Sequence, residues 1–153
     1  MSGTLTEHLS LLEFRSRRSN VGVPSSLHGN VLRLAQQLEI IRAVWGRPMT
    51  IISGYRTLAD HLAIYRELGR PAPAQSQHLE AKAADFELKG VTPTETYCAV
   101  AALIRRGDLH SGGMGWYGPD HPIHYDIGSP RDWGGFPNCS GYRLPEPAPP
   151  PSP

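Results

Sequence analysis

Two short segments in which apolar and ionisable residues alternate constrain the fold of this chain more than any other feature. Residues 83–88 carry Asp85 and Glu87 between apolar residues, and residues 123–127 carry His124 and Asp126 in the same way. Successive side chains of a β-strand point to opposite faces of a sheet, so each segment is predicted to be a strand with one apolar and one polar face. The fold must then bury one face of a sheet and leave the other for ionisable side chains.

Four further segments have the capping residues and spacings of helices. The longest runs from about Ser26 to Gly46, with apolar residues at intervals that form one stripe. Capping residues predict the other three at residues 10–18, 57–69 and 92–107. Residues 49–53 are rich in β-branched side chains and predict a third strand. This order of elements indicates an α+β fold in which about four helices pack on a small antiparallel sheet.

The links between these elements predict where a site and the end of the domain lie. Residues 70–77 and 110–122 show no regular pattern, and long loops on a compact domain usually line a site. The segment 144–153 is rich in proline and is expected to be a disordered tail. We therefore expect one domain over residues 1–143.

Composition excludes several classes of protein. The chain has 153 residues with a formal charge of +1, so it lacks the basic surface that nucleic acids or anionic membranes attract. No apolar run approaches the roughly 20 residues that span a bilayer. Cys98 and Cys139 form no metal-binding motif, and nothing in the sequence supports or excludes a bond between them.

The seven histidines point instead to histidine and carboxylate chemistry. His78 precedes Asp85 by seven positions, and His124 shares the polar character of its own strand with Asp126. Two imidazoles and one carboxylate, with a fourth position left for water, are typical ligands of a catalytic zinc ion. The spacing alone is also common by chance, so the alternative that no metal binds stays open at this point.

Four motifs surround these residues, in this order along the chain: Ser53-Gly54-Tyr55-Arg56; Ser76-Gln77-His78 through Lys82-Ala83-Ala84-Asp85; Gly113-x-Gly115-x-Tyr117; and His124-x-Asp126-x-Gly128 with Arg131 and Trp133. Together they resemble the M15 family of zinc peptidases, which includes D-Ala-D-Ala carboxypeptidases and peptidoglycan endopeptidases. The resemblance is strongest to its short branch that ends in HxDxG. It extends over roughly residues 8–135 and implies an α+β fold like that of D-Ala-D-Ala peptidases and Hedgehog domains.

The resemblance assigns expected roles to the residues of these motifs. It implies that His78, Asp85 and His124 bind one Zn²⁺. Arg56 would bind substrate and stabilise the developing oxyanion, which agrees with the fork geometry of a guanidinium, although an ordinary surface arginine is the alternative.

Other residues of the motifs have expected roles around the ligands. Ser76 would support the His78 loop and the substrate, or be an ordinary loop serine. Trp116 and Tyr117 would form one wall of the substrate groove or pack within their loop. Asp126 would either orient an imidazole or point into the cleft.

Two departures from the family pattern concern the general base and a turn. Many members carry an acidic residue three positions before the last ligand, where this chain has His121, with Asp120 beside it. Asp120, His121 and Asp126 are therefore all candidates for the base. Ala81 replaces a usual glycine, and its methyl group costs little only if its φ is negative.

These expectations lead to one main function and one alternative. The chain is predicted to be a zinc peptidase that cuts peptidoglycan stem or cross-link peptides, as carboxypeptidase or endopeptidase. The alternative is a zinc-containing module that binds the wall without cutting it. We expect a monomer, with a phage or particle partner for the tail as one option. Since no secretory signal is visible, export, lysis (as for an endolysin) or particle delivery would have to bring it to the wall.

Overall fold

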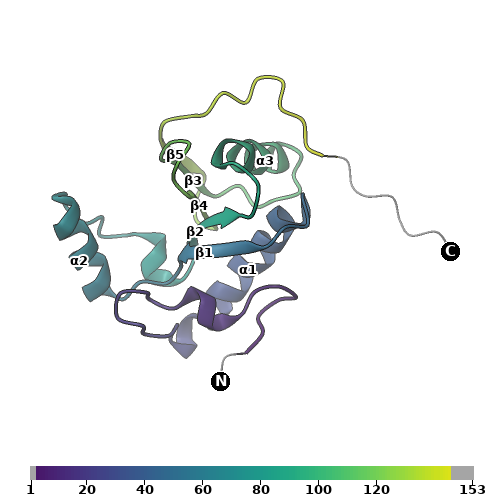
Figure 1. Cartoon of the computed structure of the whole chain (residues 1–153). Coiled ribbons are helices and arrows are strands. Elements are labelled where there is room, and N and C mark those ends of the chain that lie inside the picture. The colour runs from purple at the N-terminus through teal and green to yellow at the C-terminus, as the bar shows by residue number, and fades with distance from the viewer. Residues whose placement is uncertain (1–2, 146–153) are drawn as a thin grey trace.

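The computed structural model describes residues 3–145, which form three α-helices and five β-strands (Figure 1). The helices are α1 (His28–Ala43), α2 (Leu58–Leu68) and α3 (Pro93–Arg105), and the strands are β1 (Met49–Ser53), β2 (Ala83–Leu88), β3 (Gly113–Trp116), β4 (Ile123–Asp126) and β5 (Arg131–Gly134). Three short 3₁₀ helices complete the set: η1 (Leu11–Phe14), η2 (Ser25–Leu27) and η3 (Gln77–Glu80). The predicted α+β class is confirmed. No helix in residues 3–145 is long and apolar enough to cross a membrane.

Three of the four predicted helices form, as α1, α2 and α3. Thr57 and Thr92 cap α2 and α3 with their side chains, and Gly69 ends α2 with a φ of 67°. The stripe of α1 is fully buried, as expected for a helix that packs on the core.

The helix predicted for residues 10–18 is wrong beyond one turn. The capping box at Ser10 forms, but only η1 follows it, because Arg15 already has an extended backbone with ψ of 154°. Ser16 then pairs with Val21 and turns its hydroxyl toward Asp60 at the start of α2. A tertiary contact has overridden the local helical signal.

The sheet has the strand order β1-β2-β4-β3-β5. The pairs β1–β2, β2–β4 and β3–β4 are antiparallel, but β3 and β5 are parallel, so the sheet is mixed where the sequence predicted an antiparallel one. The sequence analysis placed β3 within an irregular link and did not predict β5. Glycines at positions 113 and 115 are poor strand formers, and their place in β3 depends on what packs over them.

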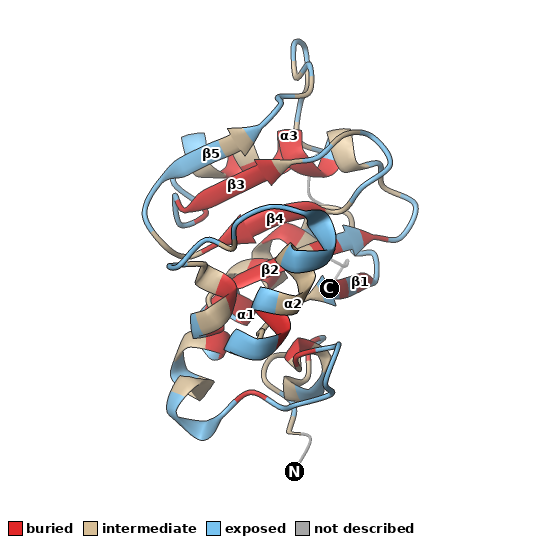
Figure 2. Cartoon of the chain, turned by 90° about the vertical axis from the view of Figure 1, so that its left-hand side faces the viewer, coloured by how far each residue is buried: buried red, intermediate tan, exposed pale blue. Residues whose placement is uncertain are grey.

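One face of the sheet is buried under helices, and the other carries the polar residues. Helices α1 and α3 contact each other and β2, and α3 also contacts β4 (Figure 1). Ile51, Phe86 and Ile123 lie opposite one another in successive strands, and all three are buried. Figure 2 shows this burial along β2, β3 and β4, and exposed residues along β5. The adjacent row across the sheet is therefore free to form a site.

The segment that follows β5 is joined to α3 by a disulfide. Cys98 on α3 and Cys139 are bonded, a pairing for which the sequence offered no support. Leu144 also packs against the core, at the position where the tail was predicted to begin. The rest of the predicted tail, residues 146–153, lies outside the described residues.

Candidate metal centre

A row of residues on the polar face crosses the sheet and contains two of the predicted ligands. Ser53, Asp85, His124, Gly115 and Trp133 lie opposite one another in β1, β2, β4, β3 and β5. Residues directly opposite each other in paired strands point to the same face, so this register alone brings Asp85 and His124 together.

The third predicted ligand comes from a turn beside the sheet. His78 lies in η3, and the Ser76 hydroxyl accepts a hydrogen bond from the His78 backbone N–H at 3.3 Å. Ala81 ends this turn with a φ of 56°, in the left-handed region. The condition of a negative φ at Ala81 is therefore not met. The Ala81 methyl group makes this backbone conformation strained, which a glycine would avoid.

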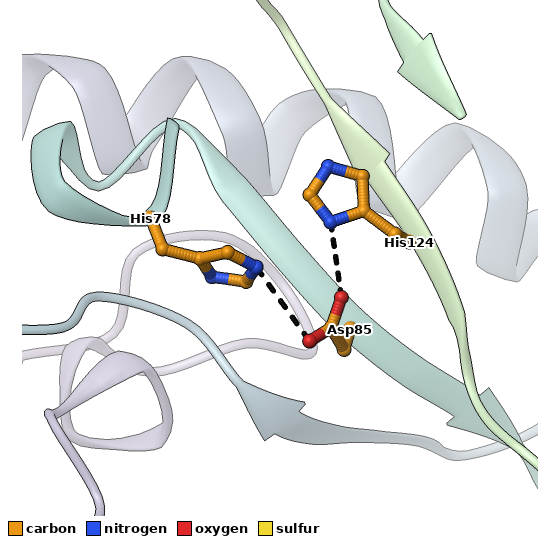
Figure 3. Close-up of side chains that lie close together, drawn as sticks. All are labelled: His78, Asp85 and His124. Carbon is orange, nitrogen blue, oxygen red and sulfur yellow. Dashed lines mark hydrogen bonds and ion pairs between the residues drawn. The ribbon is translucent and has the colours of Figure 1, made fainter. Parts of the chain in front are cut away.

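His78, Asp85 and His124 converge on one point (Figure 3). The Nδ1 atom of His124 lies 3.0 Å from one oxygen of Asp85, and the Nε2 atom of His78 lies 3.5 Å from the other. One ligand atom from each residue lies within 4.8 Å of the other two. Both imidazoles are buried, and Asp85 is half-buried.

The outer nitrogen of each imidazole has an acceptor that fixes the ring. The Nδ1 atom of His78 donates to the Gly54 carbonyl at 2.7 Å, and the Nε2 atom of His124 donates to Asp126 at 2.7 Å. These bonds leave the other nitrogen of each ring to face Asp85. Such outer hydrogen bonds are the usual way in which proteins orient histidine ligands of metals.

The titration behaviour agrees with a site for a cation. Burial opposes ionisation of Asp85, but the charge and hydrogen bonds of the two imidazoles outweigh it and hold its pKa well below the usual range. Burial lowers the pKa of His78 overall, against the raising effect of the nearby Asp85 carboxylate. Burial also acts to lower the pKa of His124, but Asp126 and Asp85 raise it overall. A metal ion bound at the Nδ1 atom of His124 can take the place of a proton on that nitrogen, which faces Asp85.

Asp126 lies behind His124, on the side away from Asp85. It is fully buried, and it accepts hydrogen bonds from the backbone N–H groups of Gly113 and Gly128 and from the Arg131 guanidinium at 2.9 Å. Burial acts against ionisation, but these donors and His124 lower the pKa of Asp126 to about 2. Of the two predicted roles, the placement corresponds to holding an imidazole rather than to pointing into the cleft.

The three residues line a cavity of about 730 Å³. Its lining includes Arg56, Ser76 and Tyr117 from the predicted set. Arg56 donates to the Ser53 hydroxyl at 3.0 Å and lies 3.4 Å from Asp85. Arg56, which lies in the link between β1 and α2, is thus held between Ser53 and the candidate ligand Asp85.

Three other predicted residues do not line this cavity. Trp116 packs edge-on against Tyr97 of α3, with ring centroids 6.0 Å apart. Asp120 lines a smaller hollow of about 190 Å³ over the Phe86 side of β2, and His121 is exposed on the same turn. The structure brings neither Asp120 nor His121 to the three candidate ligands.

Two residues that the sequence analysis quoted after the last motif, without a role, also line the cavity. Arg131 binds Asp126, and the Trp133 indole lies against the His124 ring with centroids 4.6 Å apart. Their spacing in the RxW motif was the available signal. Both residues lie in β5 and contact residues of β4, although β3 lies between these two strands in the sheet. Sequence spacing does not reveal such contacts.

Comparison with protein families matches residues 7–126 to the family described as Peptidase M15. This match extends over most of the chain and contains all three candidate ligands. The chain therefore belongs to the peptidase M15 family.

Individual relatives in this family carry more particular names. A probable peptidoglycan L,D-endopeptidase MepK of Haemophilus influenzae is 24% identical over 127 residues, which are 83% of this chain and 64% of that protein. The peptidoglycan L,D-endopeptidase MepK of Escherichia coli is 30% identical over 102 residues, which are 65% of this chain and 52% of that protein. The chain thus spans between about half and just under two thirds of these relatives. No solved structure matches it.

Proposed function

We propose that this chain is a zinc-dependent peptidase that hydrolyses peptide bonds in the stem or cross-link peptides of peptidoglycan. The observation that carries the proposal is the convergence of His78, Asp85 and His124 in the lining of one cavity, in a chain of the M15 family. The names of the MepK relatives support peptidoglycan as the substrate and favour an endopeptidase over a carboxypeptidase.

The donor set fits zinc. Two imidazole nitrogens and a carboxylate oxygen are ligands that catalytic zinc sites use, and both imidazoles already have the outer hydrogen bonds that such ligands need. When bound in such a site, zinc lowers the pKa of its water to about 7 and polarises a carbonyl group.

The chain's own residues would position and polarise the substrate. Arg56 lines the cavity beside Asp85 and can donate to the carbonyl oxygen of the scissile bond as negative charge develops there. Asp126 and Arg131 would act behind His124 by holding its ring in place. Ser76 would keep His78 in its turn.

The disulfide supports a location outside the reducing cytoplasm. Bonds such as Cys98–Cys139 form and persist in oxidising compartments, which include the bacterial periplasm and the cell exterior. Export, lysis or delivery by a particle would each bring the chain to the wall.

Digestion of purified peptidoglycan tests the proposal. The zinc-loaded chain should release fragments whose new termini, read by mass spectrometry, identify the bond cut, and His78→Ala should release none. A wild-type chain that holds one equivalent of zinc and releases nothing would contradict a hydrolase. Binding of that inactive chain to the wall would instead support a binding module, which one observation favours: Asp85 is the only carboxylate among the described residues that line the cavity.

A further inference from the structure

A tryptophan and a tyrosine from different strands meet beside the candidate metal centre. Trp133 lies in the same row as His124, with Gly115 between them in the sheet. A side chain on Gly115 would meet the His124 Cβ atom and the Trp133 Nε1 atom, each at 3.0 Å. The glycine therefore leaves the space in which the Trp133 indole lies over the sheet.

The indole fixes the phenol of Tyr117. The Trp133 Nε1–H donates a hydrogen bond to the Tyr117 hydroxyl oxygen at 2.8 Å. That oxygen acts as the acceptor, so the phenol's own hydrogen remains to be donated, and no residue in positions 3–145 accepts it. Such a donor is stronger when its oxygen already accepts a hydrogen bond, because the two bonds polarise each other.

The phenol also shares the cavity with the reacting groups. Tyr117 and Trp133 line it together with Arg56 and Asp85, and Tyr117 is 48% exposed. Burial raises the pKa of Tyr117, and the charge of Asp85 adds to this against the opposing effect of the Trp133 hydrogen bond. The phenol therefore keeps its proton at neutral pH.

We propose that the Tyr117 hydroxyl donates a hydrogen bond to the carbonyl oxygen of the scissile peptide, and that Trp133 is the positioning residue that aims it. This inference rests on the proposed peptidase function and adds a second donor beside Arg56. A fixed donor that meets charge developing in the transition state accelerates the reaction without tightening substrate binding.

Tyr117→Phe removes only the donor and keeps the ring. With zinc content unchanged, kcat on a synthetic stem peptide should fall roughly tenfold to hundredfold, while KM stays within about twofold. Tyr97→Phe is the matched control, because it removes a phenol from α3, where Tyr97 packs against Trp116. An unchanged kcat in Tyr117→Phe would overturn the proposal.

A double variant tests the positioning role of Trp133. Trp133→Phe keeps an aromatic ring against His124 but removes the indole N–H, so kcat should fall by less than in Tyr117→Phe. If Trp133 acts through Tyr117, the pair Tyr117→Phe/Trp133→Phe should have the kcat of Tyr117→Phe alone. Multiplied losses would show that Trp133 has a separate, structural effect.

Binding of an uncleavable analogue supplies a readout apart from turnover. Calorimetry with a stem peptide that carries a phosphinate at the scissile bond should show Tyr117→Phe weakened by about the same factor as kcat/KM, with the affinity for a product peptide unchanged. Equal phosphinate affinities in wild type and Tyr117→Phe would overturn the inference and leave the peptidase function intact. A zinc-loaded wild type that neither cleaves the peptide nor binds the phosphinate would overturn both.

Discussion

Single glycines decide how closely the groups around the site approach. A side chain at Gly113 would collide with the Asp126 carboxylate, and the Gly113 N–H donates to that carboxylate at 3.0 Å. Gly115 leaves room for Trp133 against His124. The two glycines therefore allow close packing behind and beside the candidate ligand His124, although glycine weakens the strand in which it lies.

At the scale of residues, Asp120 and His121 should be dispensable for catalysis. Neither lines the cavity, so Asp120→Asn and His121→Gln should keep kcat/KM for a stem peptide within about threefold of wild type. A general base contributes roughly 10²-fold to 10⁴-fold, so a loss of that size in either variant would show that the turn carries the base to the site.

At the scale of elements, α2 is held to the molecule by two buried side chains. Asp60 accepts hydrogen bonds from the hydroxyls of Ser16 and Ser19, and His61 bonds to the Pro73 carbonyl at 2.8 Å. Figure 1 shows α2 apart from α1 and α3. These anchors therefore fix the helix and the 70–77 link that together form one wall of the cavity.

Asp60 should make the stability of the protein depend on pH in the acid range. Burial acts to raise the pKa of Asp60, but hydrogen bonds from Ser16 and Ser19 outweigh it and lower the pKa. Because the pKa of Asp60 is lower in the folded chain, the ionised carboxylate stabilises the fold. This contribution is fully present at pH values above the pKa of an unfolded aspartate, about 3.9, and it is lost as the pH falls through the pKa of the folded state.

We therefore expect Asp60→Asn to cost about 1–3 kcal/mol at pH 7. Thermal melts should show the difference in Tm from wild type shrinking below about pH 4. Asp108→Asn, at an exposed position after α3, is the control and should melt like wild type at every pH. A constant difference between Asp60→Asn and wild type from pH 7 to pH 3 would contradict the assignment.

The disulfide should stabilise the edge of the sheet that carries Trp133. It closes a loop with a sequence separation of 41 residues, which contains β3, β4 and β5. Closing a loop of this length restricts the unfolded chain by about 4 kcal/mol. Cys98→Ser/Cys139→Ser should therefore melt well below wild type in calorimetry, and a reductant should lower only the Tm of wild type. Equal melting of both proteins in oxidising buffer would contradict this contribution.

At the scale of the whole molecule, binding of a metal ion at the site should stabilise the folded chain. His78, Asp85 and His124 come from η3, β2 and β4 and meet only in the folded chain. Zinc at 100 times its Kd would then add about 2.7 kcal/mol to stability, which corresponds to roughly 5–10 °C in Tm.

Scanning calorimetry with zinc or with a chelator measures this shift. It should be present in wild type and in His121→Gln, and absent in His78→Ala. The same zinc-dependent shift in His78→Ala would place the metal elsewhere in the protein.

Local patterns in the sequence predicted the strands β1, β2 and β4 and the helices α1, α2 and α3, and together with the family resemblance they indicated the three converging residues. Strand alternation sets which side chains share a face, and a cap or an apolar stripe acts within a few residues, so both can be read from neighbouring positions. The alternation of 83–88 and 123–127 thus placed Asp85 and His124 on polar faces before any pairing was known.

Only the tertiary structure decided the contacts between distant segments. The parallel pairing of β5 with β3, the Cys98–Cys139 bond, the end of the first helix at Arg15 and the contact of Trp133 with Tyr117 all depend on register across the sheet or on packing. Local propensity carries no information on these pairings, because each joins residues whose sequence neighbours do not specify the partner. The sequence therefore determined which groups could bind a metal, and the packing of β3, β4 and β5 determined which groups surround it.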